Sequence, residues 1–172
     1  MRTVRVLAVA LTLIAATNVS AQDKDQPSLI ADVARGVLLD PTTYAPAIIT
    51  WEATRLDWRS SQVFFRNGFH EQNPNFTLSG RGNDIAVGYA EGNRQILIDA
   101  FANLQVSLVN NVSTRVVEHW LVPRYPNHRK LVRTLGWIER GAVASYLSYR
   151  MSAGHFAQWR DNEQRARQMG FR

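Results

Sequence analysis

The sequence predicts an all-α fold, a helical bundle of about four helices with one long loop at about residues 69–93, after a cleaved signal peptide. Apolar residues recur at helical spacing in four segments. Proline and glycine fall where those segments end, and turn-forming residues gather in the single stretch 69–93. None of the 172 residues is cysteine. The absence of cysteine excludes disulfides, iron–sulfur clusters and thiol chemistry.

The first 21 residues have the layout of a secretory signal peptide. Arg2 and Arg5 precede the apolar run Val6–Ala16, and small residues at Val19 and Ala21 fit a cleavage site before Gln22. The run of eleven is shorter than the roughly 18 to 20 apolar residues that span a bilayer, which disfavours an uncleaved anchor. We therefore expect export, to a periplasmic or envelope-associated location in a bacterial host. Residues 22–172 would form a single domain.

Two helices are predicted before the loop. Ser28 can cap a first helix, which should stop near Asp40-Pro41 because a residue before proline is disfavoured in the α region. A second helix is expected from about Thr43 to Asn67-Gly68, where glycine suits a left-handed helix end.

Two further helices are predicted after the loop. The third, at about residues 93–121, has an apolar stripe and is expected to end at Pro123. Its stripe consists of Leu97, Phe101, Leu104, Leu108, Val112 and Val116. The fourth and basic helix, at about residues 127–169, would be capped by Asn127 and bent or broken near Gly154.

The fourth helix carries small residues at helical spacing, which predict a close helix–helix contact in the same chain or with a partner. We call these residues the small-residue ridge; they are Gly141, Ser145, Ser148 and Ser152.

Charge is unevenly distributed along the chain. Residues 124–172 contain 10 basic and 3 acidic residues, whereas residues 22–123 contain 8 basic and 11 acidic residues. Such a cationic end favours an anionic partner, and after export this partner would be a membrane surface or an envelope polymer or protein rather than nucleic acid. A solvated helix face is the alternative interpretation.

No motif for catalysis, cofactor binding or metal binding stands out. The four histidines, His70, His119, His128 and His155, form no i, i+4 pair, and no phosphate loop, dinucleotide fingerprint or nucleophile elbow occurs. We therefore assign no catalytic, cofactor or metal residue and expect no cofactor. The sequence leaves open whether the protein is an enzyme.

One motif resembles a known group of sequences. Leu56-Asp57, Ser60-Ser61, Gly68 and Glu71-Gln72-Asn73-Pro74 match the pattern L-D-x-x-[ST], glycine, E-x-N-P of an uncharacterised group of small bacterial helical membrane or envelope proteins. The match covers residues 56–74. The resemblance implies an envelope-associated bundle in which Asp57, Glu71 and Asn73 share a polar cluster, and it implies no activity.

Three functions compete. The favoured hypothesis is a non-enzymatic exported helical protein with a structural or interaction role at the cell envelope. The second is an envelope enzyme or ligand-binding bundle with a candidate polar cluster between the long loop and the helices. That cluster consists of Asp57, His70, Glu71, Asn73 and Arg94. The third is a polytopic membrane protein with degenerate spans.

Overall fold

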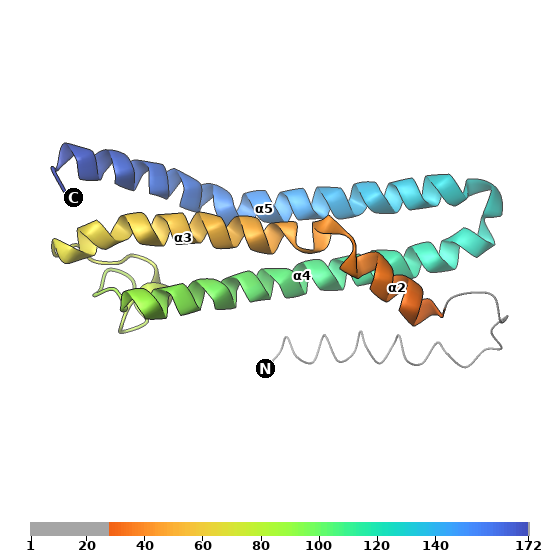
Figure 1. Cartoon of the computed structure of the whole chain (residues 1–172), viewed down its shortest axis with the longest axis horizontal. Helices are drawn as coiled ribbons and strands as arrows, with labels where there is room; N and C mark the ends of the chain where they lie inside the picture. Colours follow the sequence, from red (N-terminus) through yellow and green to blue (C-terminus); the bar gives the residue numbers. More distant parts are fainter. Residues whose placement is uncertain (1–27, 172) are drawn as a thin grey trace. The chain divides into compact units, whose positions relative to one another are not determined.

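The computed structural model describes residues 28–171, and these form an all-α helical bundle with one long loop (Figure 1). The described α-helices are α2 (Leu29–Leu38), α3 (Ala45–Arg66), α4 (Tyr89–Arg124) and α5 (Arg129–Gln168). Short 3-10 helices are η1 (Pro41–Thr43), η2 (Pro74–Phe76) and η3 (Pro126–His128). The expected signal peptide, residues 1–21, lies outside the described residues. Among the residues that are described, no helix combines the length and apolarity needed to cross a bilayer.

The first two helices begin and end as the sequence predicts. The Ser28 hydroxyl accepts a hydrogen bond from the backbone N–H of Ala31 at 3.2 Å, which caps α2. Pro46 occupies the first turn of α3, where the lack of an N–H costs nothing. Gly68 follows α3 with a φ of 84°, the left-handed conformation expected there.

The two long helices differ from the prediction in three details. Pro123 lies within the last turn of α4, which ends one residue later at Arg124. Asn127 does not cap α5; it lies within η3, and α5 begins at Arg129. The helix is not broken at Gly154, because one glycine lowers helix stability by only about 1 kcal/mol; a bend at this position stays a prediction.

The contacts within the described chain group it into two compact units, and the single domain expected from the sequence stays a prediction. Unit 1 comprises residues 28–44 and 105–144, and unit 2 comprises residues 45–104 and 145–171. The chain passes between the units three times, between Tyr44 and Ala45 at the start of α3, within α4 and within α5. Each unit is therefore built from three helical segments.

In unit 1, α2 packs on the second half of α4 (Figure 1). Leu29, Val33 and Val37 are the buried residues of α2, and they contact part of the predicted apolar stripe of α4. The contacting stripe residues are Leu108, Val112 and Val116. This half of the predicted stripe faces the core.

The centre of unit 1 also holds a network of four charges. Arg140 of α5 donates from Nε to Asp40 Oδ2 at 2.8 Å and from Nη1 to Glu118 of α4. Arg115 of α4 bonds the same two carboxylates, through Nη2 to Asp40 at 3.1 Å and through Nη1 to Glu118 at 3.4 Å. The Arg140 and Asp40 side chains are 2% and 4% exposed. Two acids and two arginines are thus paired within the core, and of these groups Arg115 Nε is buried with no hydrogen-bond partner in the described residues.

Unit 2 is organised around Trp58 of α3, which packs with Phe76 of η2 and Ile96 of α4. The Trp58 indole N–H donates to the carbonyl of Tyr89 at 3.3 Å. The loop between α3 and α4 is held by two isolated antiparallel bridges, Glu71 with Asp84 and Thr77 with Ala86. These contacts hold together the loop that the sequence predicts at about residues 69–93.

Candidate functional site

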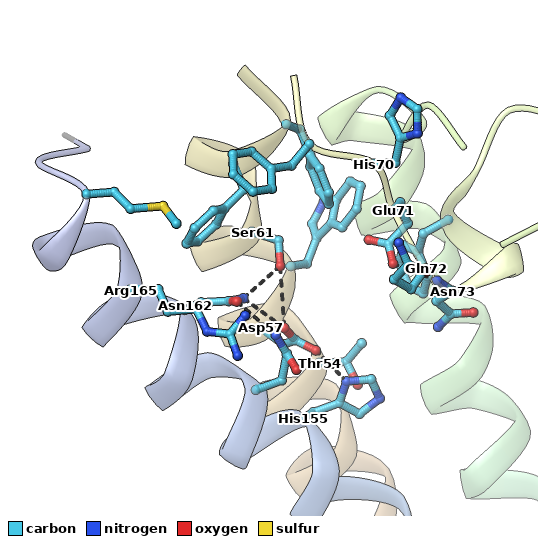
Figure 2. A pocket seen from close by; sticks show the side chains of 17 residues that line it. Thr54, Asp57, Ser61, His70, Glu71, Gln72, Asn73, His155, Asn162 and Arg165 are labelled. Carbon is cyan, nitrogen blue, oxygen red and sulfur yellow. Dashed lines mark hydrogen bonds and ion pairs between the residues drawn. The ribbon is translucent and has the colours of Figure 1, made fainter. Parts of the chain in front are cut away.

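A pocket of about 480 Å³ lies in unit 2, a volume within the usual range for small-molecule sites (Figure 2). Residues of α3 and of α5 line one side, and the loop residues 69–73 line the other. The aromatic lining residues are Trp58, Phe64, Phe65, Phe69 and Phe76. The pocket therefore combines an apolar wall with two groups of polar side chains.

Asp57 is the centre of the first polar group. Its Oδ2 atom lies 2.8 Å from Nδ1 of His155, which is 98 residues away in the sequence (Figure 2). Its Oδ1 atom accepts a 3.5 Å hydrogen bond from the hydroxyl of Ser61, one helical turn further along α3. The Asp57 side chain is 17% exposed, so this carboxylate is partly shielded from water.

Asn162 of α5 completes this group and is 6% exposed. Its Nδ2 atom donates to Ser61 Oγ at 2.9 Å and to Ser60 Oγ at 3.1 Å, and it lies 3.4 Å from Asp57 Oδ1. Gln158 donates to the Asn162 side-chain oxygen at 2.9 Å, which fixes the amide orientation. His155 and Asn162 are seven residues apart, two helical turns, so α5 presents both to α3.

The second polar group belongs to the loop. Glu71 is held by backbone hydrogen bonds with Asp84, and its Oε1 atom accepts the backbone N–H of Asn73 at 2.7 Å. Asn73 in turn caps η2 by accepting the N–H of Asn75 at 3.1 Å. Hydrogen bonds from Ser79 and from the Ile85 N–H lower the pKa of Asp84 below its ordinary value, which keeps this end of the loop charged.

Four of the five candidate cluster residues line this pocket: Asp57, His70, Glu71 and Asn73. Within residues 28–171, no hydrogen bond or ion pair joins Asp57 to Glu71, and Figure 2 shows His70 lying apart from the Asp57 group. The fifth candidate, Arg94, does not line the pocket. It is exposed on α4, where its Nη1 atom lies 3.8 Å from Glu91.

Sequence reasoning missed the α5 contribution, His155 and Asn162. Their two-turn spacing was the available signal, but it cannot indicate which distant helix these side chains meet.

The chemistry of the Asp57 group is that of an oriented imidazole. When neutral His155 donates its Nδ1 proton to Asp57, its Nε2 atom is left as a hydrogen-bond acceptor. The Ser61 hydroxyl contacts Asp57 and Asn162, not His155, so the three residues do not form the relay of a serine hydrolase. Over the described part of the chain, no group of three or more histidine or acidic side chains could hold a metal ion.

Unit 1 carries a second candidate site, a set of exposed residues in the segment 120–138, which covers the end of α4, η3 and the start of α5. We call it the hairpin surface. Its aromatic and aliphatic members, between 49% and 64% exposed, are Trp120, Tyr125, Leu131, Leu135, Trp137 and Ile138. Its exposed cations are Arg124, Arg129, Lys130 and Arg133.

The small-residue ridge does not share one environment. Ser152 is 4% exposed and Ser148 is half-buried, whereas Ser145 is exposed. A methyl group added at Gly141 would meet no atom within 4 Å. The end of the ridge near Ser152 is therefore packed, and contact of the whole ridge with a partner helix stays a prediction.

No known protein family, curated protein or solved structure matches the chain.

Proposed function

We propose that the chain is an exported envelope protein that binds the surface of an anionic membrane through the hairpin surface of unit 1. The observation that carries the proposal is the coincidence of free cations and exposed apolar side chains in one short segment. Residues 119–138 contain no acidic residue but include Arg124, Arg129, Lys130 and Arg133. None of these four forms an ion pair with any residue in the described range.

The apolar members lie on a definite face of α5. Leu131, Leu135 and Ile138 follow the i, i+4, i+7 spacing of one helix face, and each is more than half exposed. Gly136 and Arg140, on the opposite face, are buried. A helix that buries one face in its own unit and exposes a second apolar face has a surface suited to the headgroup–acyl boundary.

The flanking residues favour lipid over a protein partner. Trp120, Tyr125 and Trp137 are residue types that concentrate at membrane interfaces, because each joins an apolar ring to a polar atom. Each cation near an anionic bilayer contributes about 1 kcal/mol. Arg129 and Arg133 share the helix face of Gly136 and Arg140 and line a cavity of unit 1 with Asp32, Asp40 and Glu118. The cations of the segment and the apolar face therefore supply the two kinds of attraction that peripheral membrane binding requires from different faces of α5.

Co-sedimentation with lipid vesicles tests the proposal. The protein should partition onto vesicles containing phosphatidylglycerol and much less onto pure phosphatidylcholine, with binding that weakens as salt is raised. The variant R124Q/R129Q/K130Q/R133Q should bind at least about tenfold more weakly, since each lost cation removes part of the attraction.

A variant of unit 2 with the same charge change serves as the control. R59Q/R66Q/R81Q/R94Q removes four exposed cations that lie outside the hairpin surface, and it should bind like the parent. If both variants lose vesicle binding equally, binding depends on net charge alone. That result would overturn the assignment of membrane binding to the hairpin surface. Equal binding to neutral vesicles would overturn the role of anionic lipid.

Export has its own test. N-terminal sequencing of protein recovered from envelope fractions should begin at Gln22, because Val19 and Ala21 offer small side chains to a signal peptidase. Recovery of the chain with residues 1–21 still attached would contradict a cleaved signal peptide.

A further inference from the structure

The pocket of unit 2 is acidic as well as aromatic. Its lining includes two carboxylates, Asp57 and Glu71, and one arginine, Arg165. The arginine pairs with Asp161, which lies outside the lining, with Nε 3.0 Å from Oδ2. Asp57 is likewise paired, with His155 inside the pocket, so Glu71 is the lining carboxylate that makes the pocket attractive to a cation.

The two carboxylates differ in whether one of their oxygens lacks a hydrogen-bond partner. Both oxygens of Asp57 already have partners in His155, Ser61 and Asn162. Glu71 uses Oε1 to accept the Asn73 N–H, whereas its Oε2 atom has no hydrogen-bond partner in residues 28–171. Glu71 Oε2 is thus the acceptor that is available to a bound molecule.

The aromatic wall favours the same ligand class. Phe69 is 46% exposed and lines the pocket beside its neighbour in sequence, His70. Phe64, which contacts Phe69 edge to face with ring centroids 5.6 Å apart, lines the pocket too. Aromatic faces attract cations, and their apolar area accommodates a hydrocarbon body.

We propose that this pocket binds a small organic cation, a protonated amine with an apolar or aromatic body, whose ammonium group bonds to Glu71 Oε2. The site lies within unit 2 and is independent of the membrane-binding surface proposed for unit 1. The Asp57, His155 and Asn162 group forms the base of the site by joining α3 to α5, and Asp57 adds negative charge from that side. Anionic ligands such as phosphates are disfavoured by both carboxylates.

Benzylamine, benzyl alcohol and benzoate are suitable probes, since they share a ring and differ in charge. Titration followed by amide NMR shifts should show benzylamine binding with a Kd on the order of 1 mM or tighter. The shifts should involve residues 69–73 and the Trp58 indole. Benzyl alcohol should bind at least about tenfold more weakly, because it lacks the charge-assisted hydrogen bond, and benzoate should not bind.

Glu71→Gln should weaken benzylamine binding at least about tenfold, since it removes the charge but keeps an oxygen to accept the Asn73 N–H. Glu91→Gln, a change at an exposed glutamate of the same unit outside the pocket, is the matched control and should bind like the parent. Phe69→Leu should also weaken binding while keeping the side chain apolar. Unaltered thermal melting of each variant would exclude a folding effect.

Three results would overturn the proposal: no benzylamine shifts up to about 10 mM, benzoate or benzyl alcohol binding as tightly as benzylamine, or Glu71→Gln binding like Glu91→Gln. Vesicle binding is measured separately, so failure here leaves the membrane proposal intact.

Discussion

Arg140 and Asp40 are 100 residues apart in the sequence, and the Arg140 Nε atom donates to Asp40 Oδ2 at 2.8 Å inside unit 1. This contact connects α5 to the turn between α2 and α3. Because Arg140 also contacts Glu118, a single side chain joins three segments of unit 1.

Replacing Arg140 with methionine should destabilise the protein by about 3 to 5 kcal/mol, because two buried carboxylates lose the more deeply buried of the two arginines that they share and keep only Arg115. Urea unfolding followed by far-UV circular dichroism measures the change. Arg94→Met is the control, since Arg94 forms only an exposed pair with Glu91 and should change stability by less than about 1 kcal/mol. Unfolding of Arg140→Met at the urea concentration of the parent would refute a stabilising role for the network.

Acid should weaken the same network. Burial alone would raise the pKa of Asp40, but hydrogen bonds from the Thr42 hydroxyl and N–H and from Arg140 outweigh it and hold that pKa below its ordinary value of 3.8. A carboxylate with a lowered folded-state pKa stabilises the fold fully above 3.8 and loses this contribution as pH falls through the folded value. The stability difference between the parent and Asp40→Asn should therefore shrink on acidification below that pH. A difference that stays constant or grows would contradict the ion-pair account.

Gly92 permits the contact between α4 and Trp58. A methyl group at this position would overlap the Trp58 indole ring, so Gly92→Ala should cost about 1 to 3 kcal/mol by overpacking. Gly154→Ala provides the contrast, because a methyl group there meets no atom within 4 Å and alanine favours a helix by about 1 kcal/mol. Thermal melting should thus move down for the first variant and up for the second. If the melting temperatures of both variants move in the same direction, the free space around the added methyl group does not decide the change in stability.

The small-residue ridge yields a prediction within a single helix. Ser152→Leu should destabilise the protein by about 1 to 3 kcal/mol, because Ser152 is 4% exposed and a larger side chain must displace its neighbours. Ser145→Leu, at an exposed position two turns earlier, should change the free energy of unfolding by less than about 0.5 kcal/mol. If Ser145→Leu is the more damaging, the ridge contacts a partner at Ser145, not the core at Ser152.

Local signals predicted most of the helix ends. Ser28, Pro46 and Gly68 act through their own backbone geometry, so their effects can be read without knowing what lies nearby. The 3-10 turn at η3 was missed because Asn127 resembles a cap in sequence, whereas the Pro126 turn places it inside that short helix.

Periodicity predicted α4 as a helix but only half of its buried face. Leu97 and Phe101 continue the stripe of Leu108 and Val112 in sequence, yet they are 59% and 60% exposed. The buried face instead includes Asn111, which is 2% exposed and donates to the hydroxyls of Thr42 and Thr43. An apolar stripe predicts an interface but does not indicate whether it faces the helix's own core, lipid or another chain.

The candidate cluster shows a similar limit. Asp57, Glu71 and Asn73 belong to one continuous motif, and their common pocket follows from the short path between them along the chain. His155 and Asn162 reach Asp57 from about 100 residues away, and such pairing depends on the packing of α5 on α3 rather than on any local pattern.

The division of each unit into two separate stretches of sequence constrains the order in which the chain can fold during synthesis. Arg140 is synthesised after Asp40 and Glu118. The two carboxylates therefore stay solvated until Arg140 has left the ribosome and can pair with them. Unit 2 is complete only when residues 145–171 have been made. The aromatic core around Trp58 lies within residues 58–96 and can form first, whereas the charged core of unit 1 has to form later.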